Sequence, residues 1–222
     1  MEYGFGVFEK KEEDYMVIIF GTTNERKMED VRNIIKELNL DIDVKGLSDI
    51  SWDRGETEEN GNTLEENSLI KALAIYDFCK EKGIKYPILT DDAGLFVESL
   101  NGEPGIYTGR YADYERSINP SLPKYECVNK LLRKLEEALD RDAYYRCVVT
   151  CMYPDGTYFQ DSGISYGEIS EKIVEPIVKP YFYSVFKLNN TDKTFNLLSG
   201  DELENSYRYS AFKKVLVKIN KK

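Results

Sequence analysis

Three observations in the amino-acid sequence predict a mixed α/β fold. Short apolar runs of buried-strand type alternate with longer segments whose apolar residues recur at helical spacing. Two strand-like segments, 144–153 and 157–166, are joined by Pro154-Asp155-Gly156, a turn sequence that predicts an antiparallel hairpin. The sequence contains no internal repeat, low-complexity tract or linker, so we expect a single domain with one or two lobes.

Composition narrows the class of protein further. The 222 residues are 41% apolar and carry a formal net charge of −10, which is typical of a globular protein with a substantial core. The acidic balance argues against a nucleic-acid partner, because binding to a phosphate backbone usually requires a basic surface. No apolar run reaches membrane-spanning length and no signal sequence opens the chain, so we expect no membrane partner and a cytoplasmic location. The four cysteines lack paired metal-ligand spacing and are expected to be reduced thiols.

Histidine is absent from the sequence. This absence excludes nucleophiles activated by histidine and zinc sites with histidine ligands. Any acid–base chemistry must therefore use carboxylates, lysine, tyrosine or metal-bound water. The clusters of aspartate and glutamate become the main candidates for a functional site.

The first regular elements are a strand and a helix joined by a short polar turn. Residues 1–15 have no clear period and are expected to form an extension ahead of a single domain over 16–222. The run 17–20 predicts a buried strand, and the helix after it has apolar residues at Met28, Val31, Ile34, Ile35 and Leu38. The turn 21–24 between them offers hydroxyl and backbone N–H groups for an anion, with Lys27 nearby; the alternative is an ordinary helix N-cap with an exposed lysine.

The next segments predict a strand at 42–47, a polar loop at 48–62 and a helix from 63 to about 82. The helix begins with a capping box, a threonine followed three residues later by a glutamate. Lys71 lies among apolar residues of this helix. We expect its ammonium group either to reach past them to solvent or to point at a phosphate group.

The stretch 88–111 contains the clearest candidate site. An apolar run ends at Asp91 and Asp92, and further apolar residues follow, which predicts a strand, an acidic corner and a second strand. Ionised carboxylates are costly to bury without a cation, so a divalent metal ion would stabilise this pair. The alternative is one solvated carboxylate and one that caps a turn. The turn-rich loop 101–105 then leads to Arg110, a cation on the same connection.

The remainder of the chain predicts a helix, the hairpin, a further strand and a last helix. The first of these helices has apolar residues at helical spacing between 125 and 139. The strand is expected over 181–188, after two prolines. The last helix has its apolar residues between 209 and 219, and the acidic residues at 201–204 suit its N-terminal end.

Three of these segments together favour a metal-bound polyphosphate as the ligand. The polar turn and Lys27 would hold phosphate, the acidic loop offers Glu58 and Glu59, and the paired aspartates follow the central strand. Mg²⁺ binds carboxylate and phosphate oxygens while keeping several waters, and a free carboxylate can deprotonate such a water for attack on phosphorus. The residues alone therefore indicate a metal-dependent hydrolase of phosphate esters or anhydrides.

Three ordered motifs between residues 17 and 111 also resemble those of the inosine/xanthosine triphosphate pyrophosphatase family. They are Gly21-Thr22-Thr23-Asn24 with Lys27, then residues 58–68 with Lys71, and then Asp91-Asp92-Ala93-Gly94-Leu95 with residues 100–107 and Arg110. Members of this family hydrolyse non-standard purine nucleoside triphosphates to the monophosphate and pyrophosphate. The resemblance implies an elongated, bilobal α/β domain in which helices flank a mixed, twisted β-sheet around a central cleft. It also implies a homodimer.

The resemblance implies roles for individual residues by their position. The triphosphate would be bound by Thr22, Thr23, Asn24, Lys27 and Lys71. Glu58 or Glu59, together with Asp92, would bind Mg²⁺. Asp92 would act as the general base, with Asp91 beside it. The serine that usually follows the paired acids in the family is Ala93 here, so only its backbone N–H remains for a substrate contact.

The C-terminal third departs from the family's pattern. The base-recognition sequence Gly-Phe-Gly-Tyr-Asp-Pro is best placed at 179–184, where its aspartate becomes Tyr183. A Ser-His-Arg sequence at the start of the last helix retains Arg208 but has Tyr207 in place of histidine, and an upstream lysine becomes Glu202. In the family, the aspartate, histidine and lysine would recognise a 6-oxopurine base by hydrogen bonds. Because such bonds discriminate strongly between bases, we expect the replacements to change the base preference.

Aromatic character survives at the positions expected to contact the base. Tyr181, Phe182 and Tyr207 would either stack on a base or pack in the core. We therefore predict a Mg²⁺-dependent nucleoside triphosphate pyrophosphatase with an altered base preference. The alternative is a nucleotide-binding or sensing protein of the same fold with weak or no hydrolysis. The intact pair Asp91-Asp92 favours the enzyme.

Overall fold

The computed structural model describes residues 15–204 and 206–221. The expected N-terminal extension therefore lies outside the described residues except for Tyr15. The strands are β1 (Met16–Phe20), β2 (Ile42–Lys45), β3 (Ile88–Val97), β4 (Pro104–Gly105), β5 (Asp142–Met152), β6 (Tyr158–Ile169) and β7 (Phe186–Leu188). The helices are α1 (Glu25–Glu37), α2 (Leu64–Lys82), α3 (Asp113–Ile118), α4 (Glu126–Lys134), α5 (Asp201–Glu204) and α6 (Tyr207–Ile219).

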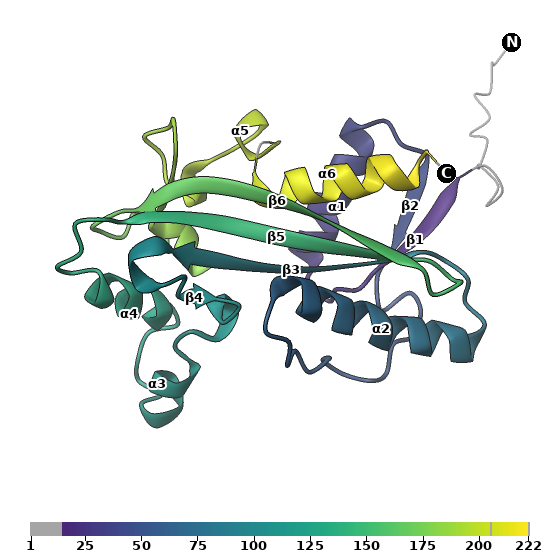
Figure 1. The fold of residues 1–222 in the computed structure, drawn as a ribbon, viewed down its shortest axis with the longest axis horizontal. Coiled ribbons are helices and arrows are strands. Elements are labelled where there is room, and N and C mark those ends of the chain that lie inside the picture. The colour runs from purple at the N-terminus through teal and green to yellow at the C-terminus, as the bar shows by residue number, and fades with distance from the viewer. Residues whose placement is uncertain (1–14, 205, 222) are drawn as a thin grey trace, which may run out of the picture.

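The strands form one mixed sheet, which confirms the predicted α/β class. Its seven strands have the order β2-β1-β3-β5-β6-β7, with β4 paired to β3. The long strands β3, β5 and β6 run along the length of an elongated molecule, with α2 on one face and α6 on the other (Figure 1). Among the described residues, no helix combines the length and apolar composition needed to cross a membrane.

The pairing of β3 positions the candidate site. Its ten residues pair antiparallel with β5 from Ile88↔Met152 to Val97↔Ala143. On its other edge β3 pairs with the parallel strand β1 only at Ile88 and Leu89, and β4 joins that edge only at Leu95 and Phe96. The edge of β3 between these two partners is left without a strand neighbour in the described part of the chain. Side chains from both faces of the sheet can meet there.

Apolar residues on opposite faces of β1 fill two separate cores. Ile18 and Phe20 pack with α1 and α6, whereas Ile19 packs with α2, as the alternation of side chains along a strand requires. Phe20 also meets Phe212 of α6 edge to face, with ring centroids 5.2 Å apart. The helices on both faces are thereby fixed relative to the carboxyl end of β1.

The two helices that begin near this end have the N-caps expected from the sequence. The Asn24 side chain accepts from the backbone N–H groups of Arg26 and Lys27, and Thr63 accepts from that of Glu66. The Glu66 carboxylate accepts from the N–H group of residue 62, which completes a local capping network. Helices α1 and α2 therefore start at the positions that bring Lys27 and Lys71 toward the open edge of β3.

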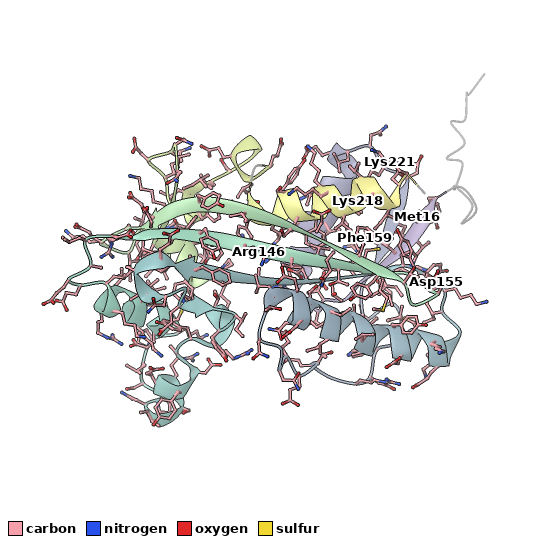
Figure 2. All side chains as sticks on the ribbon, viewed as in Figure 1. Met16, Arg146, Asp155, Phe159, Lys218 and Lys221 are labelled. Atoms are coloured by element: carbon pink, nitrogen blue, oxygen red, sulfur yellow. The ribbon has the colours of Figure 1, made fainter. Side chains whose placement is uncertain are left out.

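Helix α6 lies directly on β6. A Cβ atom added at Gly163 would lie only 2.1 Å from the carbonyl oxygen of Tyr207, so this close approach requires glycine. Toward the other end of the helix, Lys218 Nζ lies 5.6 Å from the ring centroid of Phe159 (Figure 2). This packing holds the first turn of α6, which carries Arg208, against the sheet.

Two predictions about the central and C-terminal strands are wrong. Residues 88–97 form one continuous strand rather than two strands around an acidic corner, because Asp91 and Asp92 both keep extended backbone paired with β5. Residues 181–184 form a 3-10 turn, and only 186–188 are a strand. The Ser184 hydroxyl donates to the carbonyl of residue 181 at 2.7 Å, which stabilises the turn.

Two helix boundaries also differ from the expectation. The acidic residues 201–204 form the separate helix α5 instead of the first turn of the last helix. The last helix begins only after Ser206, whose side chain accepts from the backbone N–H group of Tyr209 as its N-cap. Helix α4 ends at Lys134 rather than near residue 139. Its C-cap is Leu135, whose backbone N–H group donates to carbonyls of the last turn.

Candidate active site

A polar cleft lies at the open edge of β3. Its cavity measures about 270 Å³ and is lined by Lys27, Glu59, Lys71, Asp92, Ala93, Ile106, Gly109, Arg110 and Arg208. Four of these side chains are cations, contributed by α1, α2, α6 and the segment after β4. A protein with a net charge of −10 thus concentrates positive charge in one cleft, which suits a polyanionic ligand.

Asp91 points from β3 toward α1 and α6 and is only 3% exposed. Lys27 Nζ lies 3.0 Å from Asp91 Oδ1 and 3.1 Å from Oδ2, and Arg208 Nη1 also donates to Oδ2. Burial alone would raise the pKa of Asp91, but the charges of Lys27 and Arg208 outweigh it and hold that pKa well below its usual range. Two cations therefore stabilise this buried carboxylate, and Asp91 in turn fixes two cations that line the cleft.

Asp92 points to the opposite face, toward α2, because successive side chains alternate along a strand. Lys71 Nζ lies 3.8 Å from Asp92 Oδ1 and 3.3 Å from Glu59 Oε1. Burial raises the pKa of Asp92, Lys71 opposes this rise, and the negative charge of Glu59 adds to it. Asp92 is therefore a stronger base than an ordinary aspartate, as a group that accepts a proton requires.

The second oxygen of Asp92, Oδ2, is buried and has no well-formed hydrogen bond within the described residues. The nearby amide of Asn67 offsets only part of the rise in the pKa of Asp92. An unpaired carboxylate oxygen beside a second carboxylate, Glu59, fits a hard divalent cation that takes its other ligands from phosphate and water. Within the described ranges, no group of three or more acidic, cysteine or histidine side chains lies close enough together to hold a metal ion. Glu59 and Asp92 are thus the protein groups available to a metal.

The acidic loop contributes only one of its two candidate carboxylates to the cleft. Glu59 lines the cleft, whereas Glu58 is exposed and is not among the lining residues. The loop is held in place by Asn67, which is fully buried and accepts from the backbone N–H of Gly61 at 2.9 Å. Arg110 also reaches the backbone carbonyl of Glu59 at 3.5 Å. Sequence spacing did not distinguish the two glutamates, because the loop has no regular period.

The turn between β1 and α1 forms a helix N-cap, which was the alternative interpretation of its sequence. Asn24 caps the helix, and the Thr22 hydroxyl accepts from the N–H group of Asn24 at 3.2 Å. Thr23 is exposed at the helix N-terminus. Lys27 is not an exposed lysine, because its ammonium group turns inward to Asp91 and its side chain is 29% exposed.

A second cavity, of about 310 Å³, adjoins the cleft and shares Arg208 with it. Its lining includes Tyr183 and three residues of α1, which are Arg26, Asp30 and Glu37. The sequence motifs gave no reason to single out these α1 residues. The only signal is their spacing of four and seven residues, which places them along one side of the helix.

The aromatic residues expected at a base-binding position are mostly in the core. Phe182 and Tyr207 are 3% and 2% exposed, and the Tyr207 ring stacks on Tyr145 with centroids 4.8 Å apart. The hydroxyl groups of Tyr183 and Tyr207 form a hydrogen bond of 2.7 Å. Glu202 forms an ion pair with Lys193 at 2.7 Å and lines neither cavity. Phe182 and Tyr207 therefore pack in the core, which was the alternative to stacking on a base.

Comparison with known proteins gives one consistent result. Residues 18–218 match the sequence model of the Ham1 family. A dITP/XTP pyrophosphatase of Bacillus licheniformis is 36% identical over 203 residues, which cover 89% of this chain and 95% of that protein. One of Flavobacterium johnsoniae is 32% identical over 181 residues, or 81% and 85% of the two chains.

Solved structures agree with this match. The structure of the Staphylococcus aureus Ham1 protein superposes with a TM-score of 0.74 at 30% identity and covers 91% of this chain and 97% of its own. A HAM1 protein from Coxiella burnetii has a TM-score of 0.76 at 24% identity, covering 93% and 100% of the two chains. The second of these, at its lower identity, supports the fold alone.

Proposed function

The chain belongs to the Ham1 family, and we propose that it hydrolyses nucleoside triphosphates to the nucleoside monophosphate and pyrophosphate with the help of Mg²⁺. The named relatives, dITP/XTP pyrophosphatases, support this reaction class. The observation that carries the proposal is the position of Asp92. A partly desolvated, unusually basic carboxylate lies beside Glu59 in a cleft lined by four cations.

The cations of the cleft are the proposed partners of the triphosphate. Lys27, Lys71, Arg110 and Arg208 line one cavity, so a polyphosphate chain placed there would contact charges from several elements. We also propose that the turn Thr22-Thr23-Asn24 and the backbone N–H of Ala93 bind phosphate oxygens. The place of the turn at the N-terminus of α1, and the place of Ala93 in the lining of the cleft, support this assignment.

Glu59 and Asp92 are proposed to hold the metal ion, and Asp92 to accept the proton of the attacking water. Mg²⁺, when bound, would reduce the negative charge of the phosphates and lower the pKa of a coordinated water. In the reaction, one water oxygen forms a bond to phosphorus and the anhydride bond between the α- and β-phosphates breaks. One proton of the water passes to Asp92, and pyrophosphate leaves with the electron pair of the broken bond. Lys27 and Arg208 would stabilise the negative charge that develops on the phosphates.

The second cavity is the proposed location of the base, because it shares the lining residue Arg208 with the cleft. Tyr183 lines it where the family's pattern has aspartate, and its hydroxyl is already engaged with Tyr207. A neutral phenol hydroxyl that already shares a hydrogen bond is a weaker acceptor for a purine N–H than an ionised carboxylate. This difference supports a base preference unlike that of the dITP/XTP enzymes.

The remaining expectations from the sequence are proposals of the same kind. We propose that residues 16–222 form one enzymatic domain, that the protein is a cytoplasmic homodimer, and that it binds a small nucleotide rather than a nucleic acid. The family match supports the small-nucleotide substrate. Light scattering at micromolar concentration tests the dimer directly.

The proposed activity predicts metal-dependent release of pyrophosphate from a panel of nucleoside triphosphates. The panel contains ITP, XTP, the four standard nucleotides and modified pyrimidines, each assayed with Mg²⁺ and with excess chelator. We expect release only with Mg²⁺ and a clear preference within the panel. Nucleotide binding detected by thermal shift without any release would support a sensing protein instead. Neither binding nor release would contradict the proposed function altogether.

A further inference from the structure

We propose that Lys71 acts as a placeholder for the metal ion, so that a divalent cation binds Glu59 and Asp92 only together with a triphosphate. The proposal rests on the function proposed above and extends it to the order of binding. Its basis is the position of one ammonium group. Lys71 Nζ lies 3.3 Å from Glu59 Oε1 and 3.8 Å from Asp92 Oδ1, and so stands between the two carboxylates available to a metal.

The burial of these three side chains favours their pairing. The side chains of Lys71, Asp92 and Glu59 are only 15%, 13% and 29% exposed. Charges in such positions are costly to leave without a partner, because solvent stabilises them only in part. Without a ligand, Lys71 and the two carboxylates neutralise each other in part. A metal ion that took both carboxylates would leave the ammonium group without a partner.

A triphosphate supplies the partner that the displaced lysine would need. Lys71 lines the same cavity as Lys27 and Arg208, so phosphate oxygens placed among these cations would lie within its reach. The lysine can then exchange carboxylate for phosphate while its stem stays in α2. That helix is fixed one turn earlier, where the Thr90 hydroxyl donates to the carbonyl of Ser68 at 2.7 Å.

The net charge of the cleft also favours binding of the metal ion together with the triphosphate rather than before it. Four cations line the cavity, against Glu59, Asp92 and the buried Asp91 beside it. A bare divalent cation would therefore enter a region that is already positive, which is unfavourable at separations of a few ångströms. A metal–triphosphate complex carries net negative charge and would be attracted. Asp92 Oδ2, which has no well-formed hydrogen bond within the described residues, is the oxygen available to the incoming ion.

Direct metal binding to the full-length protein tests the proposal without relying on turnover. Mn²⁺, which can be followed by electron paramagnetic resonance, is titrated into the wild-type protein, Lys71→Met and Lys27→Met. We expect weak binding to the wild type and at least about tenfold tighter binding to Lys71→Met, because a nearby positive charge has been removed. Lys27→Met is the matched control, since it removes a cation of the same cleft that pairs with Asp91 instead. It should change Mn²⁺ affinity much less.

Two further titrations define the site and its coupling to nucleotide. Adding a non-hydrolysable α,β-methylene triphosphate should give the wild type tight Mn²⁺ binding, and adding Glu59→Gln to Lys71→Met should abolish the gain. Thermal melting checks that each variant is folded, and Lys71→Gln serves as a second variant. Wild-type protein that binds Mn²⁺ alone as tightly as Lys71→Met would overturn the proposal, as would an equal gain in Lys27→Met. Failure of the proposed function would appear separately, as absence of pyrophosphate release by the wild type.

Discussion

Asp91→Asn is expected to lower the free energy of unfolding by about 3 kcal/mol, the usual scale for breaking a buried ion pair. The substitution keeps the shape of the side chain but leaves Lys27 and Arg208 without the carboxylate that both contact. Urea unfolding at neutral pH measures the loss. Activity should fall as well, because the two cations would no longer be held in the cleft.

The dependence of this loss on pH provides an independent check. The pKa of Asp91 is lower in the folded protein than in the unfolded chain, so its carboxylate stabilises the fold at pH values above its ordinary pKa of about 4. That contribution is lost as the pH falls below about 4 toward the depressed pKa of the folded state. The difference in stability between the wild type and Asp91→Asn should therefore shrink below about pH 4. A difference independent of pH would mean that the ion pairs with Lys27 and Arg208 are not its cause.

Asp92→Asn is expected to cause a large loss of turnover and no loss of stability, whereas the main effect of Asp91→Asn is a loss of stability. Removing a general base typically costs about 10²–10⁴-fold in rate, and this change also removes a proposed metal ligand. Burial raises the pKa of Asp92, so its ionised form weakens the fold above its ordinary pKa. The neutral amide should therefore leave the melting temperature unchanged or raise it slightly at pH 7.

Two measurements on Asp92→Asn check this expectation, with Asp91→Asn as the matched control on the neighbouring residue. The first is the rate of pyrophosphate release at saturating Mg²⁺, and the second is the melting temperature at pH 7. Full turnover with normal metal dependence would rule out Asp92 as base and metal ligand. A melting temperature that falls as far as that of Asp91→Asn would show that Asp92 is a structural ion-pair partner.

Local features of the site were predictable from the sequence because they depend on neighbouring residues. The N-cap at Asn24, the capping box at Thr63 and the hairpin 142–169 all follow from short-range spacing. The candidate cations Lys27 and Lys71 were also identified, since Lys27 lies in the first turn of α1 and Lys71 lies about two turns into α2.

Long-range contacts were not predictable in the same way. Arg208 meets Asp91 across 117 positions of the chain, and no local spacing connects them. Interpreting 88–97 as two strands around a corner also hid the alternation that sends Asp91 and Asp92 to opposite faces. The sequence therefore indicated one acidic pair, whereas the fold gives its members different partners. Asp91 organises cations, and Asp92 remains available for a metal ion and a proton.

The most direct test of the proposed activity is the identity of its products. Wild-type protein is incubated with Mg²⁺ and the best nucleotide of the panel, and the products are resolved by ³¹P nuclear magnetic resonance, with Asp92→Asn as the inactive control. We predict nucleoside monophosphate and pyrophosphate in equal amounts, without a diphosphate intermediate. Nucleoside diphosphate and inorganic phosphate as products, or equal product from Asp92→Asn, would contradict it.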